Sequence, residues 1–218
     1  MSDRRMGKNG RHDPRDWFGN IDIYLFDQVM KGRFDDRRSI LEVGCGSGRN
    51  LLYFMRAGYD LFGIDRNPGA VETVQAAASL HAPGLPAGNF QVADADRIPH
   101  DDGRFDAVIS VALLHFADGC AQFDRMVDAM WRVLGSDGLF FVRLASSIGI
   151  EDRVEPIGDR RFRVPDGSER FLVDEKILLQ TTERIGGTLL EPIKTTNVQN
   201  MRCMTTWCLR KGPENREP

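Results

Sequence analysis

Three glycines at alternate positions stand between a short apolar stretch and the start of a helical pattern. Residues 44–48 have the sequence GCGSG, directly after the mostly apolar stretch 39–43 and before the helical pattern of 49–57. Glycine lets the backbone turn sharply and lets a ligand approach without a Cβ in the way. The helix that follows offers unpaired backbone N–H groups that can hold an anionic group. This segment therefore predicts a loop that binds a ligand through its backbone.

Two acidic residues follow the next two predicted strands. Asp65 stands at the end of the stretch 59–64, 21 residues after the first loop glycine. Asp94 follows the stretch 90–93. A carboxylate at the first position can accept hydrogen bonds from both ribose hydroxyls, and one at the second can accept from an adenine amino group. Two alternatives stay open: Asp65 could cap the helix after it, and Asp96 could take the role of Asp94.

The elements that must position these residues alternate between strand and helix. The predicted strands are nearly continuous apolar runs, which is typical of a parallel sheet buried on both faces. The polar stretch 146–169 is rich in proline and glycine and predicts a long irregular loop that acts as a lid. We expect a tail over 1–14, a single domain over 15–211 and a second tail over 212–218. The predicted strands are 39–43, 59–64, 90–93, 105–111, 139–144, 189–195 and 201–209, and the predicted helices are 15–32, 49–57, 68–80, 121–134 and 173–184.

The net charge, the length of the apolar runs and the cysteine content exclude several classes of protein. The chain has 218 residues and a formal net charge of −3, without a basic stripe, so we expect no nucleic-acid partner. Its longest uncharged apolar run, 107–116, is too short for a membrane span, and no apolar stretch typical of a signal peptide follows the first residues. Four scattered cysteines predict neither a disulfide framework nor a zinc site. We therefore expect a cytoplasmic protein without a metal, as a monomer or homodimer.

The glycine spacing differs from that of dinucleotide-binding folds, which usually have GxGxxG where this chain has GxGxG. The chain instead resembles the class I S-adenosylmethionine-dependent methyltransferases, and the small-molecule members such as the tellurite-resistance type are the most similar. The resemblance covers about residues 38–145. It implies an α/β fold, a Rossmann-like three-layer αβα sandwich with a mostly parallel seven-stranded sheet and an antiparallel C-terminal hairpin. The motifs that carry it are, in order, Glu42, Gly44, Gly46, Gly48, Asp65, Asp94 and the strand that begins with Phe105-Asp106.

The resemblance also implies how S-adenosylmethionine binds, with S-adenosylhomocysteine as the product. Glu42 and the glycine loop would hold the methionine end, while Asp65 would hold the ribose and Asp94 the adenine. A buried strand carboxylate such as Glu42 is costly unless a ligand or loop N–H groups satisfy it, which supports this role. The implied cofactor-binding residues are Glu42, Gly44, Cys45, Gly46, Gly48, Asp65, Arg66, Asp94, Ala95, Ser110 and Val111.

Fewer residues of the sequence indicate how the methyl acceptor would bind or react. His115, after the fourth predicted strand, could be the base that deprotonates a hydroxyl or an amine, although a lone histidine among apolar residues is more often structural. Trp17, Phe18 and Tyr24 on the first predicted helix could cover the donor or the acceptor, since aromatic faces attract a sulfonium, or could only pack the helix. The basic cluster 160–163 could bind an anionic substrate or be a solvated run of charge.

We therefore predict in-line transfer of a methyl group from S-adenosylmethionine to a small molecule, with the protein aligning the reactants. The fourth strand lacks the Asn/Asp-Pro-Pro-aromatic signature of amino-group DNA methylation. A soft nucleophile, such as a thiol or a chalcogen oxyanion, needs no base. Two alternatives remain: an NAD(P)-dependent oxidoreductase on the same fold, and a non-catalytic module that binds S-adenosylmethionine.

Overall fold

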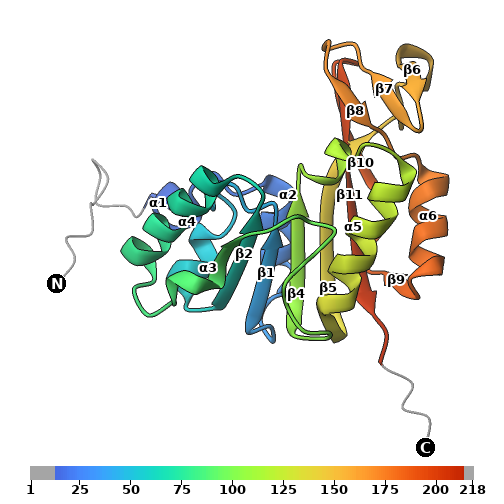
Figure 1. The fold of residues 1–218 in the computed structure, drawn as a ribbon. Helices are drawn as coiled ribbons and strands as arrows, with labels where there is room; N and C mark the ends of the chain where they lie inside the picture. Colours follow the sequence, from blue (N-terminus) through green and yellow to red (C-terminus); the bar gives the residue numbers. More distant parts are fainter. Residues whose placement is uncertain (1–12, 214–218) are drawn as a thin grey trace, which may run out of the picture.

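A mixed β-sheet of eight strands runs through the middle of the protein (Figure 1). The computed structural model describes residues 13–213, so most of both predicted tails lies outside the described residues. Along the sheet the strands follow the order β10-β11-β5-β4-β1-β2-β3, and β9 pairs with β11. The strands are β1 Ser39–Val43, β2 Asp60–Asp65, β3 Phe90–Val92, β4 Phe105–Val111, β5 Leu134–Ser146, β9 Gly187–Leu189, β10 Lys194–Val198 and β11 Arg202–Lys211.

The strands β1 to β5 pair in parallel, and β9, β10 and β11 form an antiparallel edge beside β5. Because β1 pairs with β2 on one side and β4 on the other, the strand order reverses at β1. The carboxyl ends of strands at such a reversal leave a crevice that binds ligands. The predicted fold class is confirmed. Within the described residues the sheet has one strand more than predicted, because the stretch around Pro192, which lacks a backbone N–H, separates β9 from β10.

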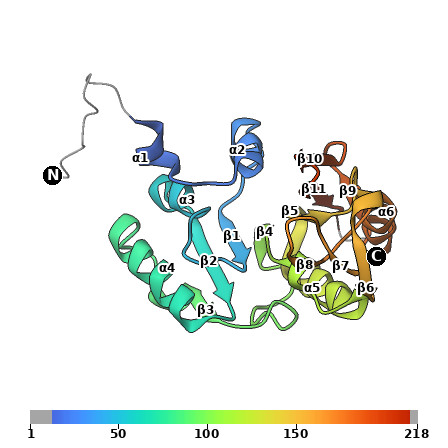
Figure 2. The same cartoon turned by 90° about the horizontal axis from the view of Figure 1, so that it is seen from above.

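The two faces of the sheet belong to two separate cores. In β1, Ile40 packs into the core formed with α2, α3 and α4, and Leu41 packs into the core formed with α5 and α6. Figure 2 shows these two groups of helices on opposite sides of the sheet. In residues 13–213, no helix has the length and apolar content to cross a membrane. The helices are α1 Pro14–Phe18, α2 Ile23–Met30, α3 Leu52–Ala57, α4 Pro68–His81, α5 Cys120–Val133 and α6 Glu175–Arg184, with 3-10 turns η1 Ala87–Asn89, η2 Leu114–Phe116 and η3 Glu151–Arg153.

The predicted first helix, 15–32, is two helices in the structure. α1 ends at Gly19, whose φ of +57° favours glycine. α2 begins after Asp22, whose Oδ1 accepts a hydrogen bond from the N–H of Tyr24 at 3.0 Å and satisfies the start of the helix. The prediction of one helix was wrong because the helical spacing of apolar residues continues across the break. The break itself turns Asp22 toward the sheet, where it takes part in the site described below.

The stretch 146–169, predicted as an irregular loop, contains a small second sheet instead. β5 continues to Ser146, and the chain then forms three short antiparallel strands, which Figure 1 shows beyond the end of β5. Val164 and Leu172 pack against Ala145 of β5, which attaches the small sheet to the large one. Strands this short carry too few residues to show the alternation of a strand in the sequence. The three strands are β6 Glu155–Gly158, β7 Arg161–Arg163 and β8 Glu169–Phe171.

Candidate functional site

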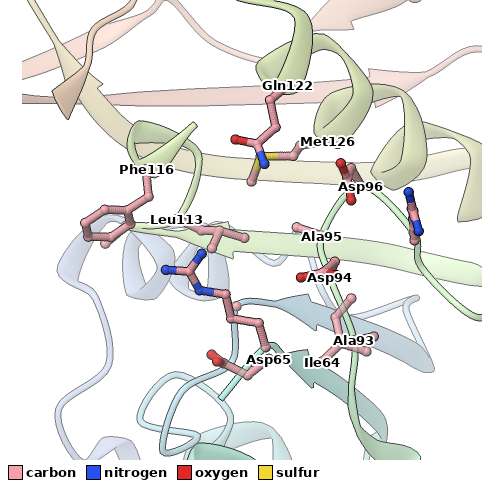
Figure 3. Close-up of a pocket in the computed structure, with 14 residues that line it drawn as sticks. Ile64, Asp65, Ala93, Asp94, Ala95, Asp96, Leu113, Phe116, Gln122 and Met126 are labelled. Atoms are coloured by element: carbon pink, nitrogen blue, oxygen red, sulfur yellow. The ribbon is translucent and has the colours of Figure 1, made fainter. Parts of the chain in front are cut away.

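A cavity of about 490 Å³ opens at the carboxyl ends of β1, β2 and β4, where the strand order reverses. Figure 3 shows Asp65 and Asp94 on the strand side of this main cavity and Gln122 and Met126 of α5 on the opposite side. Its volume is in the range of small-molecule sites. The wall is made by Gly44, Ile64, Asp65, Arg66, Ala93, Asp94, Ala95, Asp96, Arg97, Ala112, Leu113, Phe116, Gln122 and Met126. The structure thus brings together five predicted residues: Gly44, Asp65, Arg66, Asp94 and Ala95.

Backbone hydrogen bonds fix the glycine loop to the end of β2. The N–H groups of Gly44 and Cys45 donate to the carbonyl of Ile64 at 2.8 and 3.0 Å. The N–H of Gly46 donates to Oδ2 of Asp65 at 3.0 Å. Gly46 has a φ of +52°, and a Cβ added to it would meet no atom of residues 13–213 within 4 Å. The loop therefore holds a fixed shape and leaves open space beside Gly46 for a ligand.

Of the three loop glycines, Gly48 is the one at which an added side chain would make the shortest contact. Its φ is +78°, and an added Cβ would lie 2.6 Å from Cγ2 of the buried Val74. We expect Gly48→Ala to lower the free energy of unfolding by about 2 kcal/mol or more, because the left-handed conformation alone costs about 1–2 kcal/mol. Urea denaturation measures the change. Gly88→Ala is the matched control, since a Cβ there meets nothing within 4 Å; equal losses in both variants would refute the steric argument.

Cys45 faces the sheet and not the main cavity. Its side chain is buried in the core with α3 and α4, and its Sγ lies 3.0 Å from the position that a Cβ on Gly63 would take. Burial raises the pKa of the Cys45 thiol far above its ordinary value. A thiol that stays protonated and buried is a packing group, so this residue can contribute to a bound ligand only through its backbone.

The carboxylate of Asp65 is held in place by two backbone donors. Oδ1 accepts from the N–H of Asn67 at 2.9 Å, and Oδ2 accepts from that of Gly46 at 3.0 Å. The helix-cap alternative for Asp65 is wrong, because Asn67 caps α4 by accepting from the N–H of Gly69 at 3.0 Å. A carboxylate offers about four acceptor positions. Asp65 therefore has acceptor capacity left for a ligand in the main cavity.

Asp94 and Asp96 both lie in the wall of the main cavity, but their partners differ. Asp96 forms an ion pair with Arg125, with 3.4 Å between Oδ2 and Nε. The side chain of Asp94 makes no hydrogen bond or ion pair with any residue in 13–213. Asp94 is thus the carboxylate whose acceptor positions are free, which supports the predicted choice of Asp94 over Asp96 as the group that contacts the ligand.

Glu42 lies behind the glycine loop, outside the wall of the main cavity, and is only 1% exposed. Its Oε1 accepts from Nδ2 of Asn50 at 2.6 Å, whereas Oε2 is buried without a hydrogen-bond partner among the described residues. Burial raises the pKa of Glu42 to about 8, and the hydrogen bond from Asn50 only partly opposes this. A buried oxygen without a partner is costly. Oε2 is therefore ready to accept from a donor group of a ligand.

A chain of polar contacts leads from Glu42 to β5. Oδ1 of Asn50 accepts from the N–H of Asp22 at 2.9 Å, and Oδ2 of Asp22 accepts from Nη1 of Arg143 at 2.9 Å. The guanidinium of Arg143 also lies 4.8 Å from the ring centre of Tyr24. Each link is a buried or part-buried hydrogen bond, so a change at one end displaces its neighbours. Asn50, Asp22 and Arg143 are not among the predicted site residues, although Arg143 is a charge in the otherwise apolar stretch 139–144.

Ser110 and Val111 do not line the main cavity as predicted. Both lie inside β4 and are buried, and the wall begins with Ala112 and Leu113. The pairing of β4 with β5 continues through Val111, so the chain leaves the sheet only at Ala112, whose φ is +60°. Such a φ is unusual for a non-glycine residue and often marks a functional site. It brings Leu113 against Gly44, where an added Cβ would lie 2.9 Å from Leu113 Cδ2.

The three aromatic residues proposed as a cover are not in the wall of the main cavity either. Phe18 packs against Phe26 and Tyr53, with ring centres 4.6 and 5.1 Å apart. Trp17 is 47% exposed. Tyr24 lies under Arg143, and its hydroxyl is 2.5 Å from Oγ1 of Thr196 on β10. Phe18 thus takes the packing alternative, and the contacts of Tyr24 tie α2 to the antiparallel edge of the sheet.

A second hollow, of about 250 Å³, adjoins the main cavity, and Ala112 lies in the wall of both. This side hollow lies between the end of β5, the turn after β4, the small sheet and β11. The predicted basic cluster 160–163 is not part of it. Its wall is made by Ala112, His115, Arg143, Ala145, Ser146, Val164, Asp166, Ser168, Arg170, Leu172, Arg202, Cys203 and Met204.

His115 lies in the wall of the side hollow, where its ring is a hydrogen-bond acceptor. Nδ1 accepts from the N–H of Ala145 at 3.3 Å. An N–H can donate only to a ring nitrogen without a proton, so the neutral ring carries its proton on Nε2. Burial, with Arg170 nearby as a smaller cause, lowers the pKa of His115 to about 4. A neutral ring whose lone pair is already engaged is a poor base near pH 7.

Comparison with curated proteins finds methyltransferases. Residues 41–142 match the family described as "Methyltransferase domain". A phthiotriol/phenolphthiotriol dimycocerosates methyltransferase of Mycobacterium leprae is 34% identical over 103 residues, which are 46% of this chain and 35% of that protein. Ajmaline N-methyltransferase of Rauvolfia serpentina is 32% identical over 108 residues, 48% of this chain and 35% of that protein. The matched part thus spans about a third of the length of these relatives.

Comparison with solved structures finds the same fold over most of the chain. The 1,6-didemethyltoxoflavin-N1-methyltransferase of Burkholderia thailandensis, solved with bound 1,6-didemethyltoxoflavin and S-adenosylhomocysteine, has a TM-score of 0.67 at 16% identity. The alignment covers 94% of this chain and 84% of that one. The matched family, the order of the strands and the cavity at their reversal agree with one another. Residues 41–142 of this chain therefore match a methyltransferase domain, and the chain has the fold of solved S-adenosylmethionine-dependent methyltransferases.

Proposed function

We propose that this chain binds S-adenosylmethionine in the main cavity and transfers its methyl group to a small molecule. One observation carries the proposal: two carboxylates on neighbouring strand ends, Asp65 and Asp94, face the same cavity beside the open backbone at Gly46. An adenosine needs acceptors for its ribose hydroxyls and for its adenine amino group. The two carboxylates supply both kinds of acceptor, and the open glycine gives the ligand close access to the backbone.

The residues at the methionine end also fit. The amino-acid end of S-adenosylmethionine carries an ammonium group, and Oε2 of Glu42 is a buried acceptor without a partner among residues 13–213. An ammonium brought to this oxygen would favour the ionised carboxylate, which burial alone disfavours. Glu42 thereby favours ligands that carry the amino-acid end over adenosine alone. Asn50 keeps the carboxylate in place through the hydrogen bond to Oε1.

Methyl transfer itself asks little of the protein beyond alignment. When bound, S-adenosylmethionine supplies a methyl group on a sulfonium: the acceptor bonds to this carbon, the carbon–sulfur bond breaks, and its electron pair stays on sulfur. Alignment of the reacting groups can account for about 7–11 kcal/mol of the barrier. The chain contributes a rigid floor for this alignment, because Ala112 and Leu113 are fixed by the end of β4 and by contact with Gly44.

In this proposal His115 is not the base that the sequence suggested, because its ring accepts a hydrogen bond from the backbone of β5. Its Nδ1 is engaged with Ala145, and its remaining N–H on Nε2 can only donate. The acceptor is therefore a group that reacts without proton removal by this histidine, such as a thiolate or another anion. A hydroxyl or amine acceptor would have to lose its proton elsewhere.

Isothermal titration calorimetry on the full chain tests the proposal. We expect S-adenosylmethionine and S-adenosylhomocysteine to bind with micromolar or lower Kd, and NADH to show no measurable binding. Absence of binding by both adenosine ligands would refute the proposal, and binding of NADH in their place would favour an oxidoreductase. A methyl-labelled donor incubated with thiols, amines and phenols then distinguishes an enzyme from a binding module, which would retain the donor and label nothing.

A further inference from the structure

The side hollow is placed where a second reactant would meet a ligand in the main cavity. Ala112 belongs to both walls, and Phe116 of the main cavity lies under the guanidinium of Arg170, which belongs to the side hollow. The distance from the Arg170 guanidinium carbon to the Phe116 ring centre is 4.8 Å. The two hollows are thus neighbours, separated by the residues of the turn after β4. A ligand in one would lie next to a ligand in the other.

The wall of the side hollow carries more positive than negative charge. It holds Arg143, Arg170 and Arg202 against the single carboxylate of Asp166. Arg143 pairs with Asp22, which lies outside the wall, and Arg202 pairs with Asp166 at 3.7 Å. Three guanidinium groups therefore face two carboxylates. His115, the other titratable group of the wall apart from Cys203, is neutral near pH 7 because its pKa is lowered to about 4. Asp166 is thus the carboxylate of the wall that faces both Arg202 and Arg170, and one positive charge is left in excess.

Two of these arginines have donors left for a ligand. Arg170 makes no ion pair in residues 13–213, and its Nη1 donates to a backbone carbonyl, that of Glu169, at 2.8 Å. Arg143 is 16% exposed, and its Nη1 is used by Asp22, but its Nε is buried without a hydrogen-bond partner among the described residues. A buried N–H without an acceptor is costly unless something in the functional state supplies one.

A purely structural role would explain some of these contacts but not all. Arg143 ties α2 to β5 through Asp22, and Arg202 ties β11 to the small sheet through Asp166. Neither contact explains why, among residues 13–213, the Nε of Arg143 has no hydrogen-bond partner and Arg170 has no ion pair. By contrast, Arg163 of the same small sheet pairs with both Glu155 and Glu169, as expected of a structural arginine.

We propose that the side hollow is the acceptor site and that it selects small acceptors carrying a carboxylate, which Arg143 and Arg170 hold. This inference rests on the proposed function. A planar carboxylate matches the guanidinium fork and accepts the hydrogen bonds that these two residues leave unused. The volume of about 250 Å³ suits a molecule of the size of an aromatic acid and not a peptide or nucleic acid.

Calorimetry with matched pairs of probes tests the proposal on the full chain saturated with S-adenosylhomocysteine. The probes are benzoate, 3-phenylpropionate and 2-mercaptobenzoate, each compared with its primary amide, and sodium sulfate as a bare anion. We expect at least one carboxylate to bind at least 10-fold more tightly than its amide and than sulfate. Equal binding of acid and amide, equal binding of sulfate, or no binding of any carboxylate would overturn the proposal.

Variants assign the binding to these arginines. Arg170→Gln should weaken the carboxylate at least 10-fold and leave the Kd of S-adenosylhomocysteine unchanged, and Arg170→Lys should restore part of the loss. Arg163→Gln is the matched control and should bind the carboxylate as the wild type does. The same loss in Arg163→Gln, or no loss in Arg170→Gln, would overturn the proposal. Failure of S-adenosylhomocysteine to bind the wild type would instead refute the proposed function itself, and is seen before any carboxylate is added.

Discussion

Asp65→Ala is expected to weaken the binding of S-adenosylhomocysteine by on the order of 100-fold. The carboxylate is fixed by the N–H groups of Gly46 and Asn67 and still offers acceptor positions to the main cavity. A hydrogen bond to a charged group contributes about 1.5–3 kcal/mol, so the loss of two from a ribose amounts to about 3 kcal/mol or more. That is on the order of a 100-fold change in Kd, which calorimetry resolves.

Asp60→Ala is the matched control for this experiment. Asp60 begins the same strand, β2, at the end away from the main cavity, and is exposed. We expect its replacement to leave the Kd unchanged within twofold. Asp65→Asn should lie between alanine and the wild type, because an amide oxygen still accepts but lacks the charge. A Kd that stays the same in Asp65→Ala would mean that the adenosine does not lie against this strand end, and would remove the main support of the proposed function.

The donor side of the site could be predicted from the sequence because its signals are local. A strand, three alternating glycines and a helix are contiguous in the chain. Asp65 and Asp94 are far apart in sequence, but each directly follows a strand. In a parallel sheet the carboxyl ends of the strands lie at one edge, so the position of each acid at its own strand end is sufficient to bring the two together.

The acceptor side could not be predicted because long-range pairing assembles it. Arg143 comes from β5, Arg170 from β8 and Arg202 from β11, and the side hollow exists only because β11 pairs antiparallel with β5 in the register that places Cys203 opposite Ser146. Nothing near any of these arginines in the sequence indicates that register. The predicted basic cluster 160–163 was visible only as a run of charge, and it lies outside the hollow.

The predicted first helix was wrong for a local reason. The break between α1 and α2 depends on the φ of Gly19 and on the cap at Asp22, whereas the apolar spacing continues across both. Apolar spacing reports which face is buried, not whether the backbone continues. Yet the break is what turns Asp22 toward Asn50 and Arg143 and so connects Glu42 with the side hollow. The apolar spacing thus gave a wrong helix boundary at the position where the break places Asp22 in the site.

Glu42→Gln is expected to stabilise the protein without ligand at pH 8. Burial raises the pKa of Glu42 to about 8 in the folded state, from an ordinary value of 4.5. Between these two pH values the folded state keeps a proton that the unfolded state has released, so the free energy of unfolding falls as the pH rises. The fall is about 1.4 kcal/mol for each pH unit and a few kcal/mol in total. Glutamine has no carboxyl group to ionise and escapes this loss.

Urea denaturation at pH 5, 6, 7 and 8 measures this effect as a difference between variant and wild type. We expect Glu42→Gln to gain stability relative to the wild type steadily toward pH 8. Glu72→Gln, on the exposed face of α4, controls for the removal of one negative charge. The histidines and the other acids are common to all three proteins and cancel in the difference. If the free energy of unfolding changed with pH in the same way in the wild type and in Glu42→Gln from pH 5 to pH 8, ionisation of Glu42 would not be the cause of the pH dependence.

The same substitution should weaken the binding of S-adenosylhomocysteine about 10-fold while leaving 5′-methylthioadenosine unaffected. The second ligand has the adenosine but lacks the amino-acid end, so it gains nothing from an ionised carboxylate at Glu42. An effect on both ligands would indicate a general disturbance of the glycine loop. A variant that gains stability but loses affinity for the ligand identifies a residue whose role is to bind the ligand. Replacement of a residue that is needed for folding would instead lower the stability. Because Oε2 of Glu42 has no partner within the described part of the chain, we expect Glu42→Gln to gain stability and to lose affinity for S-adenosylhomocysteine.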